Sequence, residues 1–142
     1  EFYAAIPALR EKCGDRAVLR AMHYYADNHR AALQAQALRE GDFERFLQLV
    51  NESGVSSAEN LQNINAAGDP RRQAVAVALA MGKRLLGGTG AIRVHGGGFA
   101  GTVQAFVPMD MLEEFKTGME RVLGEGSCHV LSIRNEGGVR LR

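Results

Sequence analysis

The residues best suited to chemistry are three consecutive glycines, Gly96-Gly97-Gly98, placed between two short strand-like runs at 92–94 and 102–107. A residue without a Cβ can take a positive φ, and it lets another group come close to main-chain N–H donors. The spacing therefore predicts a turn between strands whose backbone approaches a phosphate or a neighbouring loop. The plainer interpretation is a hairpin turn in which the glycines serve backbone geometry alone.

Two polar side chains precede this turn. Arg93 and His95 are two positions apart on the first strand, so their side chains lie on the same side of it. They either place charge near a phosphate or form an ordinary solvated strand face. The candidate cofactor-binding residues are therefore Gly96, Gly97, Gly98, Arg93 and His95.

Two better-known phosphate motifs do not fit the same stretch. Gly96-x-Gly98-x-x-Gly101 matches a dinucleotide fingerprint, but that fingerprint needs a helix directly afterwards to hold the pyrophosphate, and residues 102–107 are rich in strand formers. No Gly-Lys-Ser or Gly-Lys-Thr follows any glycine, which excludes a Walker loop.

The positions of the other histidines and cysteines indicate structural roles and not catalytic ones. His29 falls on the apolar face of a predicted helix, which favours a hydrogen-bonded core imidazole, and His23 has no partner at metal-ligand spacing. Cys128 and His129 are adjacent in a predicted strand and point to opposite faces, so we expect Cys128 in the core. Cys13 and Cys128 are expected to be free thiols. The sequence brings no nucleophile, general base and oxyanion donor together, and we assign no catalytic and no metal-binding residue.

Composition limits the class of protein. The chain has 142 residues, 46% of them hydrophobic; this length and hydrophobic content predict one domain spanning residues 1–142. Its formal net charge is +1. Its 17 basic and 16 acidic side chains are interspersed, so we expect no nucleic-acid partner. The longest apolar run, 74–81, is far shorter than the roughly 20 residues that span a bilayer. We expect a soluble, cytoplasmic protein with no membrane partner.

Apolar spacing predicts several amphipathic helices. The first begins at residue 1 without a capping residue, from which we expect the chain to start inside a helix and to be a piece of something longer. A long helix runs from Asp15 to Gly41 and a third follows the cap Asp42. The capping box Ser56–Glu59 predicts a short helix in the 51–65 connection.

The second half alternates helices and strands. Asp69-Pro70 opens a helix that ends at Gly87-Gly88, and Asp110 caps another that ends at Gly124. Besides the two strands flanking the glycines, strands are predicted at 128–133 and 139–141, joined by a turn at 135–138. This order predicts an α+β fold in which several amphipathic helices pack on a small antiparallel β-sheet.

The glycine stretch at 90–101 resembles the third conserved motif of the galactokinases, which belong to the GHMP family of small-molecule kinases. The resemblance continues, in the same order, over 20–28, 38–43, 49–54 and 125–141, and so covers nearly the whole chain. There are departures: many galactokinases have Ser-His where this chain has Ser53-Gly54, followed by an acidic, tyrosine-containing segment, and Ala100 replaces a common glycine.

The resemblance implies the carboxyl-terminal domain of an enzyme that uses ATP and Mg²⁺ to phosphorylate galactose at the anomeric hydroxyl. The sugar-binding signature, phosphate loop and catalytic aspartate of the family belong to an amino-terminal domain, which would be this chain's partner and would bind most of the ATP and Mg²⁺. The glycine turn is then expected beside the nucleotide phosphates or against the phosphate loop. Another GHMP sugar kinase, or a stand-alone module that binds a small molecule or a partner, remains an alternative.

Overall fold

The computed structural model of the protein describes residues 1–66, 68–98, 101–134, 136–137 and 139–140. The fold is α+β, as predicted. The helices are α1 (Ile6–Cys13), α2 (Asp15–Glu40), α3 (Phe43–Ser56), α4 (Ala74–Leu86) and α5 (Leu112–Leu123), and the strands are β1 (Ala91–His95) and β2 (Thr102–Phe106). Short 3-10 turns precede α1 and α5, at Tyr3–Ala5 and Met109–Met111, and a π-helical turn, Ser57–Leu61, follows α3.

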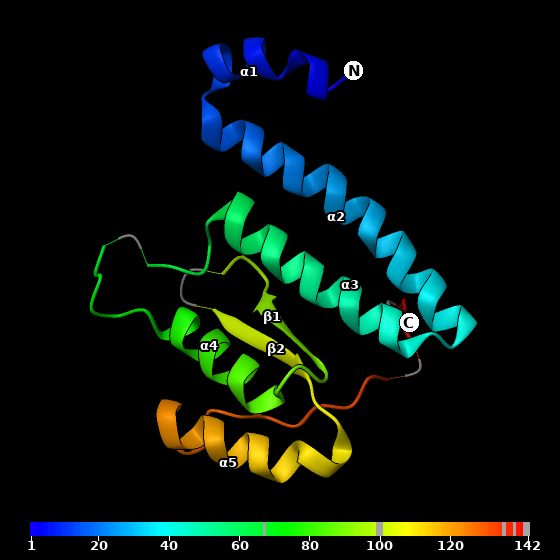
Figure 1. Ribbon diagram of the computed structural model, residues 1–142, viewed down its shortest axis with the longest axis vertical. Coiled ribbons are helices and arrows are strands. Elements are labelled where there is room, and N and C mark those ends of the chain that lie inside the picture. Colours follow the sequence, from blue (N-terminus) through cyan, green and yellow to red (C-terminus); the bar gives the residue numbers. More distant parts are fainter. Residues whose placement is uncertain (67, 99–100, 135, 138, 141–142) are drawn as a thin grey trace.

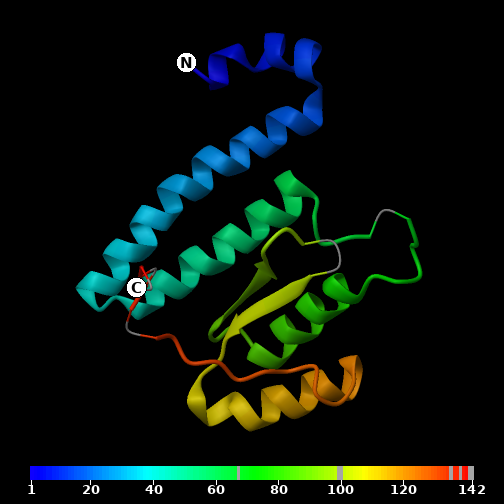
Figure 2. The same ribbon diagram turned by 180° about the vertical axis from the view of Figure 1, so that it is seen from behind.

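The elements are stacked along the long axis of the molecule. The strands β1 and β2 pair antiparallel, with Arg93 opposite Gln104 and His95 opposite Thr102. Helices α2 and α3 run side by side above the strands in Figure 1, and α4 and α5 run below them; the view from behind in Figure 2 shows the same order. Helix α1 packs on α2 at the far end of the stack.

Alternation along β1 creates two separate apolar clusters, because successive strand side chains point to opposite faces. Ile92 and Val94 face α4 and α5, in a cluster with Leu79 and Phe115. Ala91 faces α3 and joins a second cluster, made of Ala37, Phe46 and Val50 together with the partly buried Leu47 and Phe106. β1 therefore contributes fully buried side chains to both halves of the core, and β2 adds partly buried ones.

Both helices approach β1 closely because each has a glycine at the crossing. A Cβ added to Gly54 of α3 would lie 2.9 Å from the Cβ of Arg93, and one added to Gly82 of α4 would overlap the Cδ1 of Ile92. The side chain of Asn51 adds a polar link: it donates to the carbonyl of Gly90 over 3.3 Å and accepts from the N–H of Ile92 over 3.0 Å. The register of β1 is thus set by α3 as well as by β2.

Several predicted helix ends are confirmed. Gly41 ends α2 with a left-handed φ of 74°, and the Asp42 side chain accepts from the N–H of Arg45 at 2.9 Å, which caps α3. The first helix was expected from residue 1, but helical structure starts at Tyr3. Gly87 and Gly124 end α4 and α5 as expected.

Other predicted helix starts are wrong. A short helical element does follow Ser56, the π turn Ser57–Leu61, but the Ser56 side chain does not cap it, because α3 continues to Ser56 and runs directly into this turn. α4 begins after Gln73 instead of Asp69, because Asp69 accepts from the N–H of Arg71 in a separate turn. Asp110 is not a cap, since it lies inside the 3-10 turn before α5.

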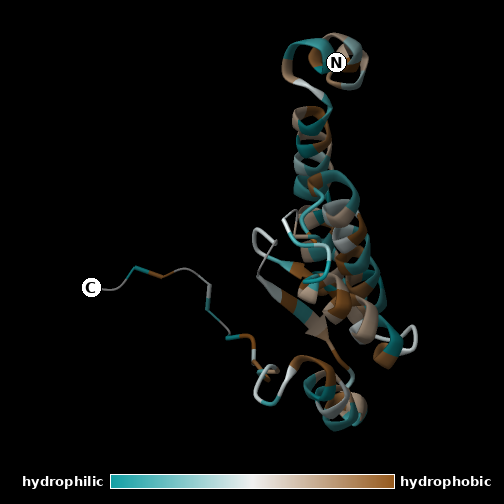
Figure 3. Cartoon of the chain, turned by 90° about the vertical axis from the view of Figure 1, so that its left-hand side faces the viewer, coloured by the Kyte–Doolittle hydropathy of each residue, from teal (hydrophilic) through white to brown (hydrophobic). Residues whose placement is uncertain are grey.

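The predicted strand at 128–133 is also wrong, and in the described part of the chain after Leu123 no strand forms. Val130, Leu131 and Ile133 are exposed, and this segment extends away from the helices in Figure 3. Strand propensity depends on a neighbouring strand to pair with, and these residues have none. Residues 135, 138 and 141, which belong to the predicted final turn and strand, lie outside the described residues.

Among the described residues, no helix is both long enough and apolar enough to cross a membrane.

The close contact of Gly82 with Ile92 leads to a prediction about the free energy of unfolding. Gly82→Ala should lower the free energy of unfolding by about 1 kcal/mol, because overpacking costs about 1–3 kcal/mol and the gain in helix propensity returns about 1 kcal/mol. Ile92→Val removes the overlapping Cδ1 and alone should cost about 0.5–1.5 kcal/mol. Urea unfolding of both single variants and the double variant checks this: the double variant should lose less than the sum. Strict additivity would show that the two positions do not touch.

Candidate functional site

The glycines form the predicted turn between β1 and β2. Gly96 and Gly98 have φ values of 69° and 77°, which L-residues with side chains rarely adopt. Gly96 and Gly97 are exposed and Gly98 is half-buried. A Cβ at Gly97 would meet no heavy atom of the described residues within 4 Å, so a side chain here would point into open space as far as the described chain shows. Phe99 and Ala100 lie outside the described residues.

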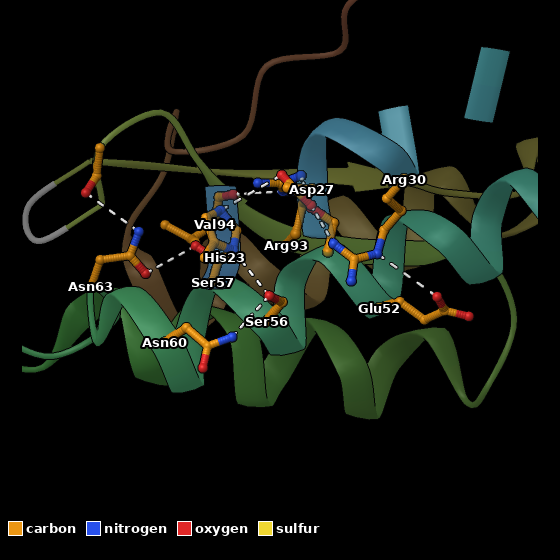
Figure 4. Close-up of polar contacts among 12 residues, drawn as sticks. His23, Asp27, Arg30, Glu52, Ser56, Ser57, Asn60, Asn63, Arg93 and Val94 are labelled. Carbon is orange, nitrogen blue, oxygen red and sulfur yellow. Dashed lines mark hydrogen bonds and ion pairs between the residues drawn. The ribbon is translucent and has the colours of Figure 1, made fainter. Parts of the chain in front are cut away.

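The turn rests on a buried asparagine that precedes α4. Asn63 is 1% exposed, and its Nδ2 donates to the carbonyl oxygen of Gly97 over 3.4 Å. A Cβ at Gly98 would overlap the backbone oxygen of Asn63 and lie 2.8 Å from its Cβ. Figure 4 shows Asn63 between Ser57 and the turn. The turn is therefore supported on one side by Asn63, and at Gly97 no described residue covers it on the side where a Cβ would point.

Arg93 and His95 occupy different surroundings. The guanidinium of Arg93 donates to Ser53 Oγ and, over 3.0 Å, to the carbonyl oxygen of Val94. Its charge thus lies against α3, and not over the glycines. His95 is exposed and directly precedes Gly96, so of these two side chains it is the one that solvent can reach next to the turn.

A polar network ties Arg93 to α2. Ser53 Oγ, which is buried, donates to Asp27 Oδ1 over 2.6 Å, and Arg30 forms an ion pair with the same carboxylate at 2.5 Å. Figure 4 shows Asp27, Arg30 and Arg93 converging between α2, α3 and β1. Burial acts to raise the pKa of Asp27, but hydrogen bonds from Ser53 and Arg30 and the charges of His23 and Arg93 outweigh it, so the pKa is lowered. The carboxylate stays ionised and holds the three elements together.

His23 lies at the edge of this network. Its Nδ1 is 3.0 Å from Ser56 Oγ and its Nε2 is 3.6 Å from Asp27 Oδ2. Burial lowers the pKa of His23; Asp27 raises it, and Arg93 and Arg30 lower it further, so the balance is a lowered pKa.

The other singled-out residues lie away from the turn. His29 is exposed, so the prediction that its imidazole lies in the core is wrong. The side chain lies on the solvent-facing side of α2. Cys128 is partly buried against the α4–α5 cluster, which agrees with its predicted place, and Cys13 is exposed; both thiols are free. Within the described ranges, no three His, Cys, Asp or Glu side chains lie close enough to hold a metal ion.

An open depression of about 990 Å³ follows the exposed side of α3, and its lining includes Asn51, Glu52, Asn60 and the turn Gly88–Gly90. It does not include the 96–98 turn. Some of its polar side chains pair with others of the lining, as Asn60 does with Ser56 and Arg30 with Glu52.

The support of the turn by Ser57 and Asn63 is the part of the site that the sequence patterns did not predict. The only signal in the sequence is the run of amide side chains Asn60, Gln62, Asn63 and Asn65 in the connection that follows α3. No known protein-family model matches the sequence.

We predict that acid destabilises the protein through His23. The folded protein holds the pKa of His23 below its ordinary 6.5, so the unfolded chain binds the proton more readily and the free energy of unfolding falls as the pH drops through that value. His23→Gln should therefore show a smaller drop in melting temperature between about pH 7 and about pH 5 than the parent protein. His29→Gln, on the exposed face of the same helix, is the matched control. A parent-like pH dependence in His23→Gln would contradict the assignment.

Proposed function

We propose that this chain is the carboxyl-terminal part of an ATP-dependent galactokinase, which converts galactose to galactose 1-phosphate in the cytoplasm. The observation that supports it most is the glycine turn, supported by Asn63 on one side and, among the described residues, uncovered where a Cβ of Gly97 would point. Such a turn offers main-chain N–H groups to an anion without a side chain in the way. The resemblance of residues 90–101 to the galactokinase motif supplies the identity of that anion, the phosphates of ATP.

In the proposed reaction, the anomeric oxygen of galactose attacks the γ-phosphorus, the bond to the β-phosphate oxygen breaks, and the hydroxyl proton passes to a base. Charge develops on the phosphoryl oxygens, and fixed N–H donors stabilise it without reorganisation. Gly96, Gly97 and Gly98 contribute this wall of the site, with His95 beside them. Arg93 acts through the backbone by holding β1 to α3.

The base, the sugar-binding groups and most of the ATP and Mg²⁺ contacts are assigned to an amino-terminal domain, which is this chain's proposed partner. Mg²⁺ would neutralise charge on the phosphates; we assign none of its ligands to this chain. Since the sugar-selecting groups lie mostly on that domain, another GHMP sugar kinase is the nearest alternative.

A stand-alone interaction module is the alternative from another class. It is favoured by the exposed aromatic side chains on the outlying helices, where Tyr3, Tyr24 and Tyr25 are more than half exposed. The coding sequence upstream of residue 1 separates the two: galactokinase requires a sugar-binding signature and a Gly/Ser-rich phosphate loop there.

Replacement of Gly97 by Val tests the role of the turn. Because a side chain at this position meets no atom of the described residues within 4 Å, the variant should keep the melting temperature of the parent protein. In the complete enzyme it should nonetheless lose at least about tenfold in kcat/KM for ATP, since it displaces the phosphates from the backbone. Gly68→Val, which also adds a side chain to open space, is the matched control. Parent-like turnover and ATP affinity in Gly97→Val would remove the functional role of the turn.

The chain by itself should show no detectable phosphorylation of galactose by ATP, because the proposed base and phosphate loop are on the other domain. A coupled ADP-release assay at high chain concentration measures this. Sustained turnover that depends on galactose would overturn the division of labour.

A further inference from the structure

The buried side chain of Asn63 has a feature that ordinary packing does not require: both ends of its amide are engaged in defined directions. Its Oδ1 accepts from Ser57 Oγ over 3.1 Å, and its Nδ2 donates to the Gly97 carbonyl over 3.4 Å. Ser57 is also 1% exposed. The carbonyl oxygen of Gly97 can only accept, so the amide nitrogen of Asn63 must face the turn, and the amide oxygen faces the Ser57 hydroxyl, which donates to it.

The backbone around Asn63 is shaped to bring this amide to the turn. The π-helical turn Ser57–Leu61 continues α3, and Gln62 then takes a left-handed conformation with φ 54°. π turns and left-handed non-glycine residues both cost conformational energy and occur often at functional sites. Beyond Asn63, Ile64 packs against the α4 cluster. The asparagine is thus anchored on both sides along the chain.

The contact with Gly97 determines where a neighbouring N–H points. In a trans peptide the carbonyl oxygen and the following N–H point in opposite directions, and the chain contains no cis peptide among its described residues. With the Gly97 carbonyl directed at Asn63, the N–H of Gly98 is directed away from Asn63. The 3.4 Å contact is long for a hydrogen bond, and the close packing of Gly98 on Asn63 provides the second restraint on the same peptide.

We infer that Asn63 is a positioning residue that holds the peptide between Gly97 and Gly98 and thereby keeps the glycine turn in the conformation that receives a phosphate of ATP. This inference rests on the proposed function of the turn. Asn63 touches no substrate itself. It acts through the backbone, and Ser57 acts through Asn63.

Asn63→Asp in the complete enzyme tests the inference through pH. The introduced carboxyl group keeps the size of the amide. When ionised it has no proton for the Gly97 carbonyl and repels it; when protonated it can donate as the amide did. Burial raises the pKa of such a carboxyl group. We expect the KM for ATP, relative to the parent enzyme at the same pH, to rise about tenfold near pH 8 and to return toward the parent value near pH 6, while the KM for galactose stays unchanged.

Asn60→Asp is the matched control, because Asn60 lies in the same segment but bonds to Ser56 and not to the turn; its relative KM for ATP should not depend on pH. A folded Asn63→Asp enzyme whose relative KM for ATP stays at the parent value at both pH values would overturn the positioning role. The proposed function would survive that result as long as Gly97→Val still impairs the use of ATP.

Ser57→Ala keeps the inference testable if Asn63→Asp does not fold. It removes the bond that holds the Oδ1 end of the Asn63 amide in place, and we expect a severalfold rise in the KM for ATP that does not vary with pH. A parent-like KM for ATP in Ser57→Ala, in a variant with a normal melting temperature, would contradict the inference.

Discussion

The close contact of α3 and α4 with opposite faces of β1 is the constraint on which the rest of the structure depends. Gly54 and Gly82 permit it, since a methyl group at either would press on Arg93 or Ile92. A two-stranded sheet is marginal by itself, and here β1 gains its position from the two helices and from the Asn51 amide. Because β1 is held so firmly, the point at which it ends, and therefore the position of the glycine turn, is determined by the core.

The same arrangement supports the turn on one side and leaves Gly97 uncovered by any described residue where a Cβ would point. Helix α3 does not stop at the core but continues through the π turn to Asn63, which reaches the turn from the side of the helices. Polar groups beneath it are paired: among the described residues, no buried side-chain nitrogen or oxygen lacks a partner. A phosphate-binding backbone needs this kind of rigidity, since donors that are already oriented stabilise developing charge most effectively.

Local sequence patterns predicted most of the helices and the hairpin, but they did not predict the contacts that hold the glycine turn. Apolar spacing located α2, α3 and α5, and the glycine cluster between two β-branched runs located the hairpin. The failures have a common cause in tertiary contacts. Asp69 and Ser56 carry capping signals, but Gln73 and the π turn set the helix boundaries. His29 falls on an apolar stripe of α2, but α2 does not turn this position to α3, and His29 is exposed. Residues 128–133 have strand propensity without a strand beside them. Asn63 could not be predicted, because its importance lies in the position of Gly97, 34 residues further along the chain.

The central claim is that the backbone of the glycine turn lies against the phosphates of ATP. Amide hydrogen exchange of the complete protein, followed in peptides that cover residues 92–98, measures this directly with and without a non-hydrolysable ATP analogue. The account predicts slower exchange at Gly96–Gly98 when the analogue is bound, with little change in peptides from α5. Unchanged exchange at the turn, at an analogue concentration that saturates the protein, would contradict it.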